Sequence, residues 1–227
     1  MKHIVRNALL SLGLVAVAQG AMAAGDAAAG ATKAAVCGAC HGADGNSLMG
    51  TFPKLAGLGE RYLLKQLMDI QAWDLEQDAE LKAKTGRAVP EMTGQLANLS
   101  KQDLEDIAAH FAAQTTQLSG SKKIEVQVNS GIKVDGLELG ERIYRAGNPT
   151  TGVPACTGCH APDGKGNSPA GFPRLSGQHP EYIEKQLRAF RAGDRTNDGD
   201  QMIMRSVADK LNDAEILALA NFIAGLN

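Results

Sequence analysis

Aromatic side chains are scarce in this sequence. Phe, Tyr and Trp together make up 4% of its 227 residues, with 5 Phe, 3 Tyr and 1 Trp. Since such rings usually fill much of a folded interior, this interior has little of its ordinary bulk and leaves room for another large apolar group. The 26 Gly and 8 Pro favour loop-rich domains with short helices.

A strong excess of one charge and a long hydrophobic run are also missing. The 23 basic and 25 acidic side chains give a net charge of −2, which provides no indication of nucleic-acid binding. No apolar stretch approaches the roughly 20 residues that cross a bilayer, so a transmembrane span is not expected. With 44% apolar residues the chain is not generally disordered, and its length suits one large or two small domains.

The N-terminus has the three parts of a secretory signal peptide. Lys2 and Arg6 are basic, residues 8–18 are apolar, and Ala21-Met22-Ala23 is a small-x-small cleavage sequence. An apolar stretch this short cannot anchor a chain across a membrane. We therefore predict that residues 1–23 are a signal peptide, that cleavage follows Ala23, and that the mature protein is exported.

The 4 cysteines belong to two copies of one motif, because Cys37-Gly38-Ala39-Cys40-His41 recurs as Cys156-Thr157-Gly158-Cys159-His160. The repeat continues, since Phe52-Pro53-Lys54-Leu55-Ala56-Gly57 matches Phe172-Pro173-Arg174-Leu175-Ser176-Gly177. Repeated units of this size indicate a duplicated domain rather than a solenoid. We predict one domain over residues 24–115, a linker over 116–136 and a second domain over 137–227, with a short insertion in the first copy between Ala72 and Arg87.

Helical spacing of apolar residues predicts an all-α fold for both copies. Helices are expected at residues 27–36, 60–72, 137–145 and 181–192, and after the capping residues Ser100 and Asn212. In the linker, the alternation of Ile124, Val126 and Val128 predicts an extended segment that lies on one domain, and no convincing sheet is expected.

Cys-x-x-Cys-His is the sequence at which haem c is attached. The two thiols add across the two vinyl groups of one haem, and the adjacent imidazole binds the iron. A structural disulfide would not require a histidine at the same place twice. A thioredoxin-like pair needs a strand–helix context that is missing, and one zinc site made from both pairs would leave the histidines unexplained. The sequence therefore predicts two covalently bound haem c groups, attached at Cys37, Cys40, Cys156 and Cys159 with His41 and His160 on the iron.

The sixth iron ligand separates an electron carrier from a catalyst, since methionine sulfur fills the position that a catalyst leaves open. Met92 and Met204 are equivalent in the repeat, because each lies seven residues before the leucine that precedes a capped helix. They are the predicted ligands, with Met202 as the rival of Met204. Met68, on a helix with apolar neighbours, is expected in the core.

Groups around the iron ligands can also be predicted. The backbone carbonyls of Pro53 and Pro173 are candidates to accept a hydrogen bond from the proximal imidazoles and fix their orientation. Haem propionates could meet cationic side chains, for which the candidates are Lys54, Arg61, Arg87 and Arg174. The repeat pairs neither His110 nor His179, so we expect both to be ordinary histidines.

Taken together, these motifs resemble the di-haem cytochrome c4 family, and so do Glu91-Met92-Thr93-Gly94 and the run from Arg195 to Arg205. The resemblance covers the whole mature chain. It implies two small class I cytochrome c domains in one periplasmic polypeptide, with the haems near the domain interface. The implied iron ligands are His41 with Met92 and His160 with Met204. Ala34 stands where the second copy has Tyr144, so the first copy's helix crossing should be packed more thinly.

The family resemblance implies electron transfer between respiratory complexes, towards a terminal oxidase. The expected partners are redox proteins such as a quinol–cytochrome c reductase or a terminal oxidase, with no nucleic acid and at most peripheral contact with a membrane. Two alternatives stay open. A di-haem peroxidase would need one haem with a vacant or labile position and nearby acid–base groups, and an electron-entry subunit of a larger oxidoreductase would use the same residues as a carrier.

Overall fold

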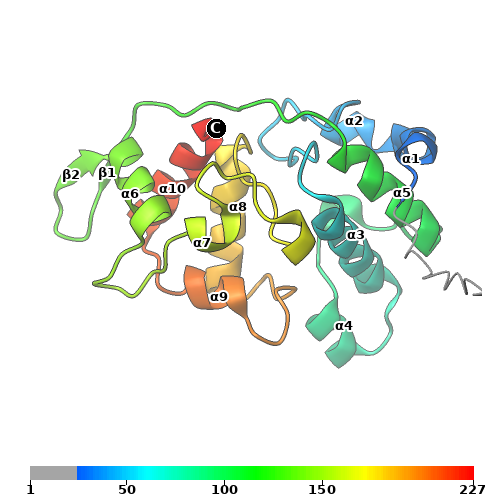
Figure 1. The fold of residues 1–227 in the computed structure, drawn as a ribbon. Coiled ribbons are helices and arrows are strands. Elements are labelled where there is room, and N and C mark those ends of the chain that lie inside the picture. The colour runs from blue at the N-terminus through cyan, green and yellow to red at the C-terminus, as the bar shows by residue number, and fades with distance from the viewer. Residues whose placement is uncertain (1–24) are drawn as a thin grey trace, which may run out of the picture.

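The computed structural model describes residues 25–227, so the predicted signal peptide lies outside the described residues. Two helical units follow one another along the chain and lie side by side (Figure 1). The first unit runs from α1 (Ala27–Lys33) to α5 (Lys101–Ala112), and the second from α6 (Gly136–Ala146) to α10 (Asp213–Gly225). None of the helices within 25–227 is long and apolar enough to cross a membrane.

The first unit contains the helices that the sequence predicts, a short helix at the Cys37 motif and one more. The predicted helix after Ser100 begins with a capping box, in which the Ser100 hydroxyl accepts from the Asp103 N–H and the Asp103 carboxylate accepts from the Ser100 N–H. The additional helix, α4, lies in the insertion of the first copy. The elements are α1 (Ala27–Lys33), the 3₁₀ turn η1 (Ala34–Val36), α2 (Gly38–His41), α3 (Glu60–Leu75), α4 (Ala79–Thr85), η2 (Pro90–Met92) and α5 (Lys101–Ala112).

The second unit repeats this order. Asn212 and Glu215 form the same capping box at the start of the last helix, and Gly193 in the left-handed conformation ends α8. The elements are α6 (Gly136–Ala146), α7 (Thr157–His160), η3 (Ser168–Ala170), α8 (Pro180–Ala192), α9 (Ile203–Ala208) and α10 (Asp213–Gly225).

Two expectations need correction. The linker forms a small antiparallel hairpin of β1 (Glu125–Gln127) and β2 (Lys133–Asp135), although no sheet was expected. Pairing puts Val126 opposite Val134, and Val126 is buried against the core of the second unit, so burial of alternate side chains stabilises a hairpin too short to show in the sequence. Met68 was expected in the core, yet it is 41% exposed because it lies on the outer face of α3. The all-α class is otherwise confirmed.

Each unit is held together by a close crossing of its first and last helices. A Cβ added to Gly30 would lie 2.0 Å from the Asp106 carbonyl oxygen on α5, and one added to Gly140 would lie 2.2 Å from the Ala218 carbonyl oxygen on α10. The crossings differ in their filling, as expected. Tyr144 is fully buried, with its ring centroid 5.6 Å from that of Phe222, whereas the small Ala34 fills the equivalent place.

The predicted linker is hydrogen-bonded along its length. The Gln117 N–H donates to Asn46 Oδ1 in the first unit (2.7 Å), and the Gly120 N–H donates to the Ala224 carbonyl in the second (2.8 Å). Asn221 both donates to the Lys122 carbonyl and accepts from its N–H, each at 2.8 Å. The later part of the linker lies on one unit, as predicted, but its first part is bonded to both, and it crosses above them in Figure 1.

Candidate functional site

A cavity of about 1000 Å³ lies in the first unit and reaches the second. Its size is at the upper end of the range of about 300–1,000 Å³ found for small-molecule and cofactor sites. Cys37, Cys40, His41 and Met92 all line it, so the structure brings together the four residues predicted for the first haem. The apolar walls include Leu63, Leu67, Ile70, Leu96, Leu99, Ile107 and Phe111.

Both proximal histidines are fixed through one ring nitrogen. His41 Nδ1 donates to the Pro53 carbonyl oxygen at 2.8 Å, and His160 Nδ1 donates to the Pro173 carbonyl oxygen at 3.0 Å. Since a carbonyl can only accept, the proton of the neutral ring is on Nδ1 and Nε2 keeps its lone pair for a metal. Burial lowers the pKa of both imidazoles, which keeps them in the neutral form that binds iron.

The cysteines stand at the ends of the short motif helices. All four are free, with Cys40 exposed and the other three half-buried. Burial raises the pKa of the Cys37 thiol, and it raises that of Cys156 to about 11. No disulfide joins either pair, so the thiols are available for attachment of a cofactor.

The methionines occupy different environments. Met92 ends η2 and packs against Ile70, Leu96 and Leu104. In the second unit, Met204 is half-buried in the first turn of α9, whereas Met202 is 48% exposed and has a left-handed backbone with φ of 48°. The large cavity is not lined by Cys156, Cys159, His160 or Met204.

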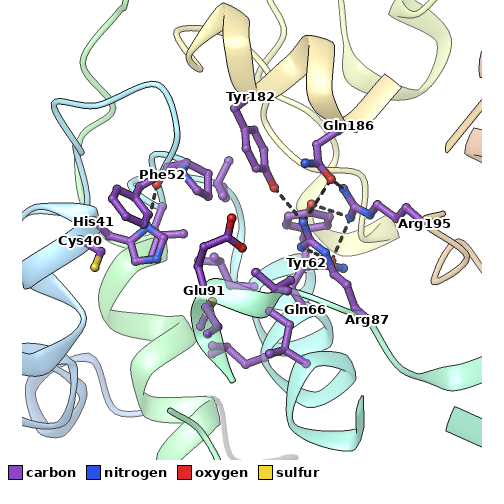
Figure 2. A pocket seen from close by; sticks show the side chains of 18 of the residues that line it. Cys40, His41, Phe52, Tyr62, Gln66, Arg87, Glu91, Tyr182, Gln186 and Arg195 are labelled. Carbon is purple, nitrogen blue, oxygen red and sulfur yellow. Dashed lines mark hydrogen bonds between the residues drawn. The ribbon is translucent and has the colours of Figure 1, made fainter. Parts of the chain in front are cut away.

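Side chains of the second unit close the cavity of the first. Figure 2 shows Tyr182, Gln186 and Arg195 facing Arg87 across the cavity wall. Arg87 donates to Tyr182 Oη at 3.0 Å and to Gln186 Oε1 at 3.3 Å. Arg195 donates in the opposite direction, to Tyr62 Oη at 3.3 Å and to Gln66 Oε1 at 2.9 Å. Each unit thus supplies one guanidinium to the tyrosine and glutamine of the other.

The other candidate cations are bonded to backbone carbonyls. Lys54 Nζ donates to the Gln117 carbonyl at 2.5 Å, Arg61 to the Pro169 carbonyl at 2.6 Å and Arg174 to the Ser176 carbonyl at 3.3 Å. Among the residues that the structure describes, Arg87 forms no ion pair with a carboxylate. Of the four candidates, Arg87 and Arg174 line the cavity.

Two residues of the interface were missed as site residues. At the repeat offset that matches Met92 with Met204, Arg87 corresponds to Gly199 and not to Arg195. The two arginines nevertheless form matching contacts. His179 was expected to be ordinary, yet it is only 9% exposed and its Nε2 donates to the Ser47 carbonyl of the other unit at 2.9 Å. Neither role has a local sequence signal, since both depend on how the two units pack.

The residues of the first cavity fit a haem c. The walls are mainly apolar, as a porphyrin requires, and two free thiols stand beside an imidazole whose Nε2 is not engaged by its Pro53 hydrogen bond. A thioether sulfur from Met92 lines the same cavity. Arg87 and Arg195 line the cavity and are among the cations available to pair with propionate groups.

Comparison with known proteins agrees with this geometry. The family model for cytochrome c matches residues 27–114 and 137–227. The chain is 53% identical over 227 residues to cytochrome c4 of Azotobacter vinelandii, covering 100% of both chains. The crystal structure of reduced recombinant cytochrome c4 from Pseudomonas stutzeri superimposes with a TM-score of 0.80 at 54% identity, covering 90% of this chain and 100% of that one.

A more distant relative has a different name. The thiosulfate dehydrogenase electron acceptor of Thiomonas intermedia (strain K12) is 34% identical over 200 residues, covering 87% of this chain and 81% of the relative. The duplicated family match and the full-length identities show an electron-transfer protein, not an enzyme, with two covalently bound haem c groups. The chain belongs to the di-haem cytochrome c4 family.

Proposed function

We propose that this protein carries electrons in the periplasm between components of a respiratory chain, towards a terminal oxidase. When bound, each haem c supplies a one-electron iron couple. The chain binds and orients the two cofactors, excludes water from them, and presents them to redox partners. Neither unit needs a substrate pocket for this role.

In the first site, Cys37 and Cys40 would hold the haem through thioether bonds, while His41 and Met92 would bind its iron. The observation that carries the proposal is the matched hydrogen bond from each motif histidine to a proline carbonyl, Pro53 in this unit. It orients the ring and makes Nε2 the metal-binding atom, an arrangement that a histidine without a metal would not need.

For the second site, Cys156 and Cys159 form the thioether bonds, and His160 and Met204 are the ligands. Pro173 orients His160 as Pro53 orients His41. Met204 is preferred to Met202 because it is the repeat equivalent of Met92 and is the less exposed of the two.

We further propose that residues 1–23 direct export and are removed. The mature chain then consists of domains at 24–115 and 137–227 joined by the linker at 116–136, and meets the membrane at most peripherally. A quinol–cytochrome c reductase is the proposed electron donor and a terminal oxidase the acceptor.

A second function, supported by the relative named as an electron acceptor of thiosulfate dehydrogenase, is acceptance of electrons from a periplasmic dehydrogenase. The two functions differ in the donor. Stopped-flow reduction by a purified quinol–cytochrome c reductase, compared with reduction by such a dehydrogenase, separates them. Faster reduction by the dehydrogenase would replace the proposed donor.

Three variants test the ligands. In the ferric protein, the absorption band for charge transfer from methionine to iron should lose about half its intensity in Met92→Ala and in Met204→Ala. Met202→Ala should keep the whole band and is the matched control, two residues away on the same segment. If Met202→Ala halves the band and Met204→Ala leaves it intact, the assignment in the second unit is wrong.

A further inference from the structure

The segments that carry the two methionines lie at the contact between the units. We name residues 86–92 the first methionine segment and residues 194–204 the second methionine segment. Both segments have hydrogen bonds to helices of the opposite unit. Contacts between the units can therefore affect the position of each proposed methionine ligand.

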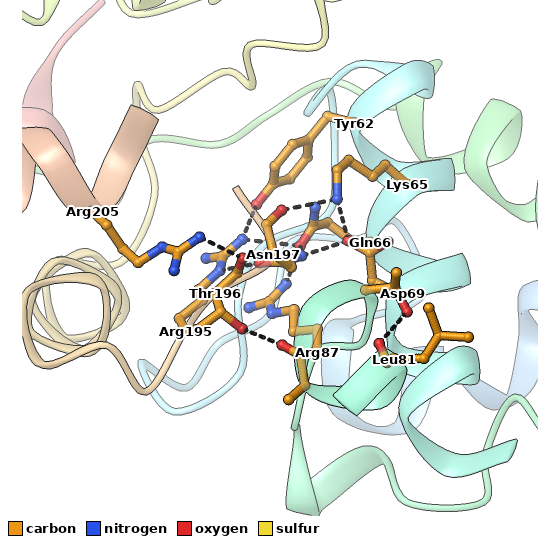
Figure 3. Close-up of polar contacts among 12 residues, drawn as sticks. Tyr62, Lys65, Gln66, Asp69, Leu81, Arg87, Arg195, Thr196, Asn197 and Arg205 are labelled. Carbon is orange, nitrogen blue, oxygen red and sulfur yellow. Dashed lines mark hydrogen bonds and ion pairs between the residues drawn. The ribbon is translucent and has the colours of Figure 1, made fainter. Parts of the chain in front are cut away.

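The second methionine segment has the larger share of these contacts (Figure 3). Asn197 Nδ2 donates to Asp69 Oδ2 at 2.6 Å and to Gln66 Oε1 at 3.0 Å, both on α3 of the first unit. The Asn197 carbonyl accepts from Lys65 Nζ at 2.9 Å. Asn197 is only 4% exposed, so its own end of these bonds is shielded from water.

The first unit's insertion also contacts this segment. Thr196 Oγ1 donates to the Ala83 carbonyl on α4 at 2.9 Å, and Lys84 Nζ lies 3.5 Å from Asp200 Oδ1. The second copy has no such insertion, so among the described residues it makes no equivalent contact with the first methionine segment. The extra helix of the first unit therefore supports a segment of the second.

The first methionine segment depends less on the opposite unit. Its contacts across the interface are those of Arg87 with Tyr182 and Gln186, and an exposed pair of Glu91 with Lys185 at 3.5 Å. Within its own unit, the Arg87 N–H donates to the Asp69 carbonyl at 2.9 Å. Just beyond the segment, the Gly94 N–H donates to Asp74 Oδ2 at 2.8 Å.

From this asymmetry we infer that Asp69 of the first unit is a positioning residue for Met204 of the second. The inference rests on the proposed ligation of iron by Met204. A hydrogen bond to a carboxylate is among the stronger ones, and the partly buried Asp69 makes one to the segment that leads into α9 (Figure 3). Without it, Asn197 loses a shielded partner and the segment can move away from the iron more often.

Helix α3 offers a matched control. Asp69 reaches the second methionine segment, whereas Asp74, on the same helix, bonds next to the first. Asp69→Ala should therefore weaken the binding of Met204 in the opposite unit, and Asp74→Ala should weaken the binding of Met92 in its own unit. Asp69→Asn keeps an oxygen acceptor for Asn197 and should behave close to wild type.

The test uses the full holo-protein and imidazole, which competes with methionine for ferric iron. In a Met92→His background the methionine charge-transfer band reports on Met204 alone, and in a Met204→His background it reports on Met92 alone. Asp69→Ala should increase the apparent imidazole affinity about tenfold where Met204 is read, as expected for losing one hydrogen bond to a charged group. In the Met204→His background, where the band reports on Met92, Asp69→Ala should change the affinity less than twofold. Asp74→Ala should have the larger effect on Met92 and the smaller effect on Met204.

Equal effects of Asp69→Ala on both methionines would indicate general destabilisation and overturn the inference, as would no effect on either. Failure of the proposed ligation has a separate signature. The two histidine backgrounds would then not each remove about half of the band, before any change at Asp69 is made.

Discussion

The functional side chains of this protein are of two kinds. Some, such as His41 and Cys37, sit in a short motif whose spacing alone predicts their chemistry. Others matter through a partner far along the chain. Asp69 and Asn197 are 128 positions apart and form a hydrogen bond of 2.6 Å. Nothing in the local sequence of either residue indicates that contact. The sequence therefore predicts the iron ligands and the prolines that orient the histidines, but not the contacts between the units.

An ion pair of the first unit gives a dependence of stability on pH. Lys33 Nζ lies 2.5 Å from Asp106 Oδ2, and the Asp26 N–H donates to Asp106 Oδ1 at 2.8 Å. These bonds, led by the one from Lys33, lower the pKa of Asp106 to about 2. An unfolded aspartate titrates near 3.9, so the stabilisation is complete above that pH and is lost as the pH falls towards 2.

Asp106→Asn should therefore lower the urea midpoint of the first unit at pH 6, and the difference from wild type should shrink between pH 4 and pH 2. Urea unfolding of the holo-protein at a series of pH values measures this. Asp135→Asn, at an exposed helix start in the second unit, is the control for a general loss of negative charge. A difference between Asp106→Asn and wild type that stays constant down to pH 2 would contradict the assignment.

The helices of the two units show how much of the fold follows from local sequence. Capping residues and apolar spacing predicted the long helices, because both signals lie within the helix itself. They did not predict the β1–β2 hairpin, which is stabilised by packing of Val126 on the core of the second unit. Nor did they predict α4, which contacts Thr196 of the second unit.

The close crossing of α6 and α10 makes a direct prediction. Gly140→Ala places a methyl group 2.2 Å from the Ala218 carbonyl, so the helices must separate. We expect a loss of about 1–3 kcal/mol in the free energy of unfolding of the second unit, the usual cost of overpacking. Thermal unfolding of the holo-protein followed by circular dichroism should show the lower midpoint.

Gly158→Ala is the matched control for this substitution. It lies in a helical turn of the same unit. Among residues 25–227, and apart from its chain neighbours and its own helix backbone, no atom lies within 4 Å of the added Cβ, and the first copy has Ala39 there. Its midpoint should equal or exceed that of the wild type. If Gly140→Ala unfolds at the same temperature as Gly158→Ala, the crossing is less tight than described.

Considered as a whole, the molecule is a duplicated fold whose two copies depend on each other. The linker is bonded to both units, the second unit closes the cavity of the first, and Arg87 and Arg195 exchange partners across the contact. Comparison of the two copies predicted the duplication and its cofactors. It could not predict the interface, because residues that pack between copies need not be equivalent within them.

The scarcity of aromatic side chains also has its explanation at this level. With 4% aromatic residues, each unit needs a large apolar body to complete its interior, and a covalently attached porphyrin is such a body. The cavity of about 1000 Å³ beside Cys37 and His41 is where the first belongs.

We propose that both irons are ligated by methionine and that the protein therefore carries electrons without binding substrates. Titration of the reduced, full-length mature protein with carbon monoxide, followed by absorption spectroscopy at neutral pH, tests this most directly. We expect negligible binding at either haem, since in the proposed ligation His41 with Met92 and His160 with Met204 leave no open position on either iron. Ready binding of one carbon monoxide per chain would show an open iron, as a di-haem peroxidase requires, and would contradict it.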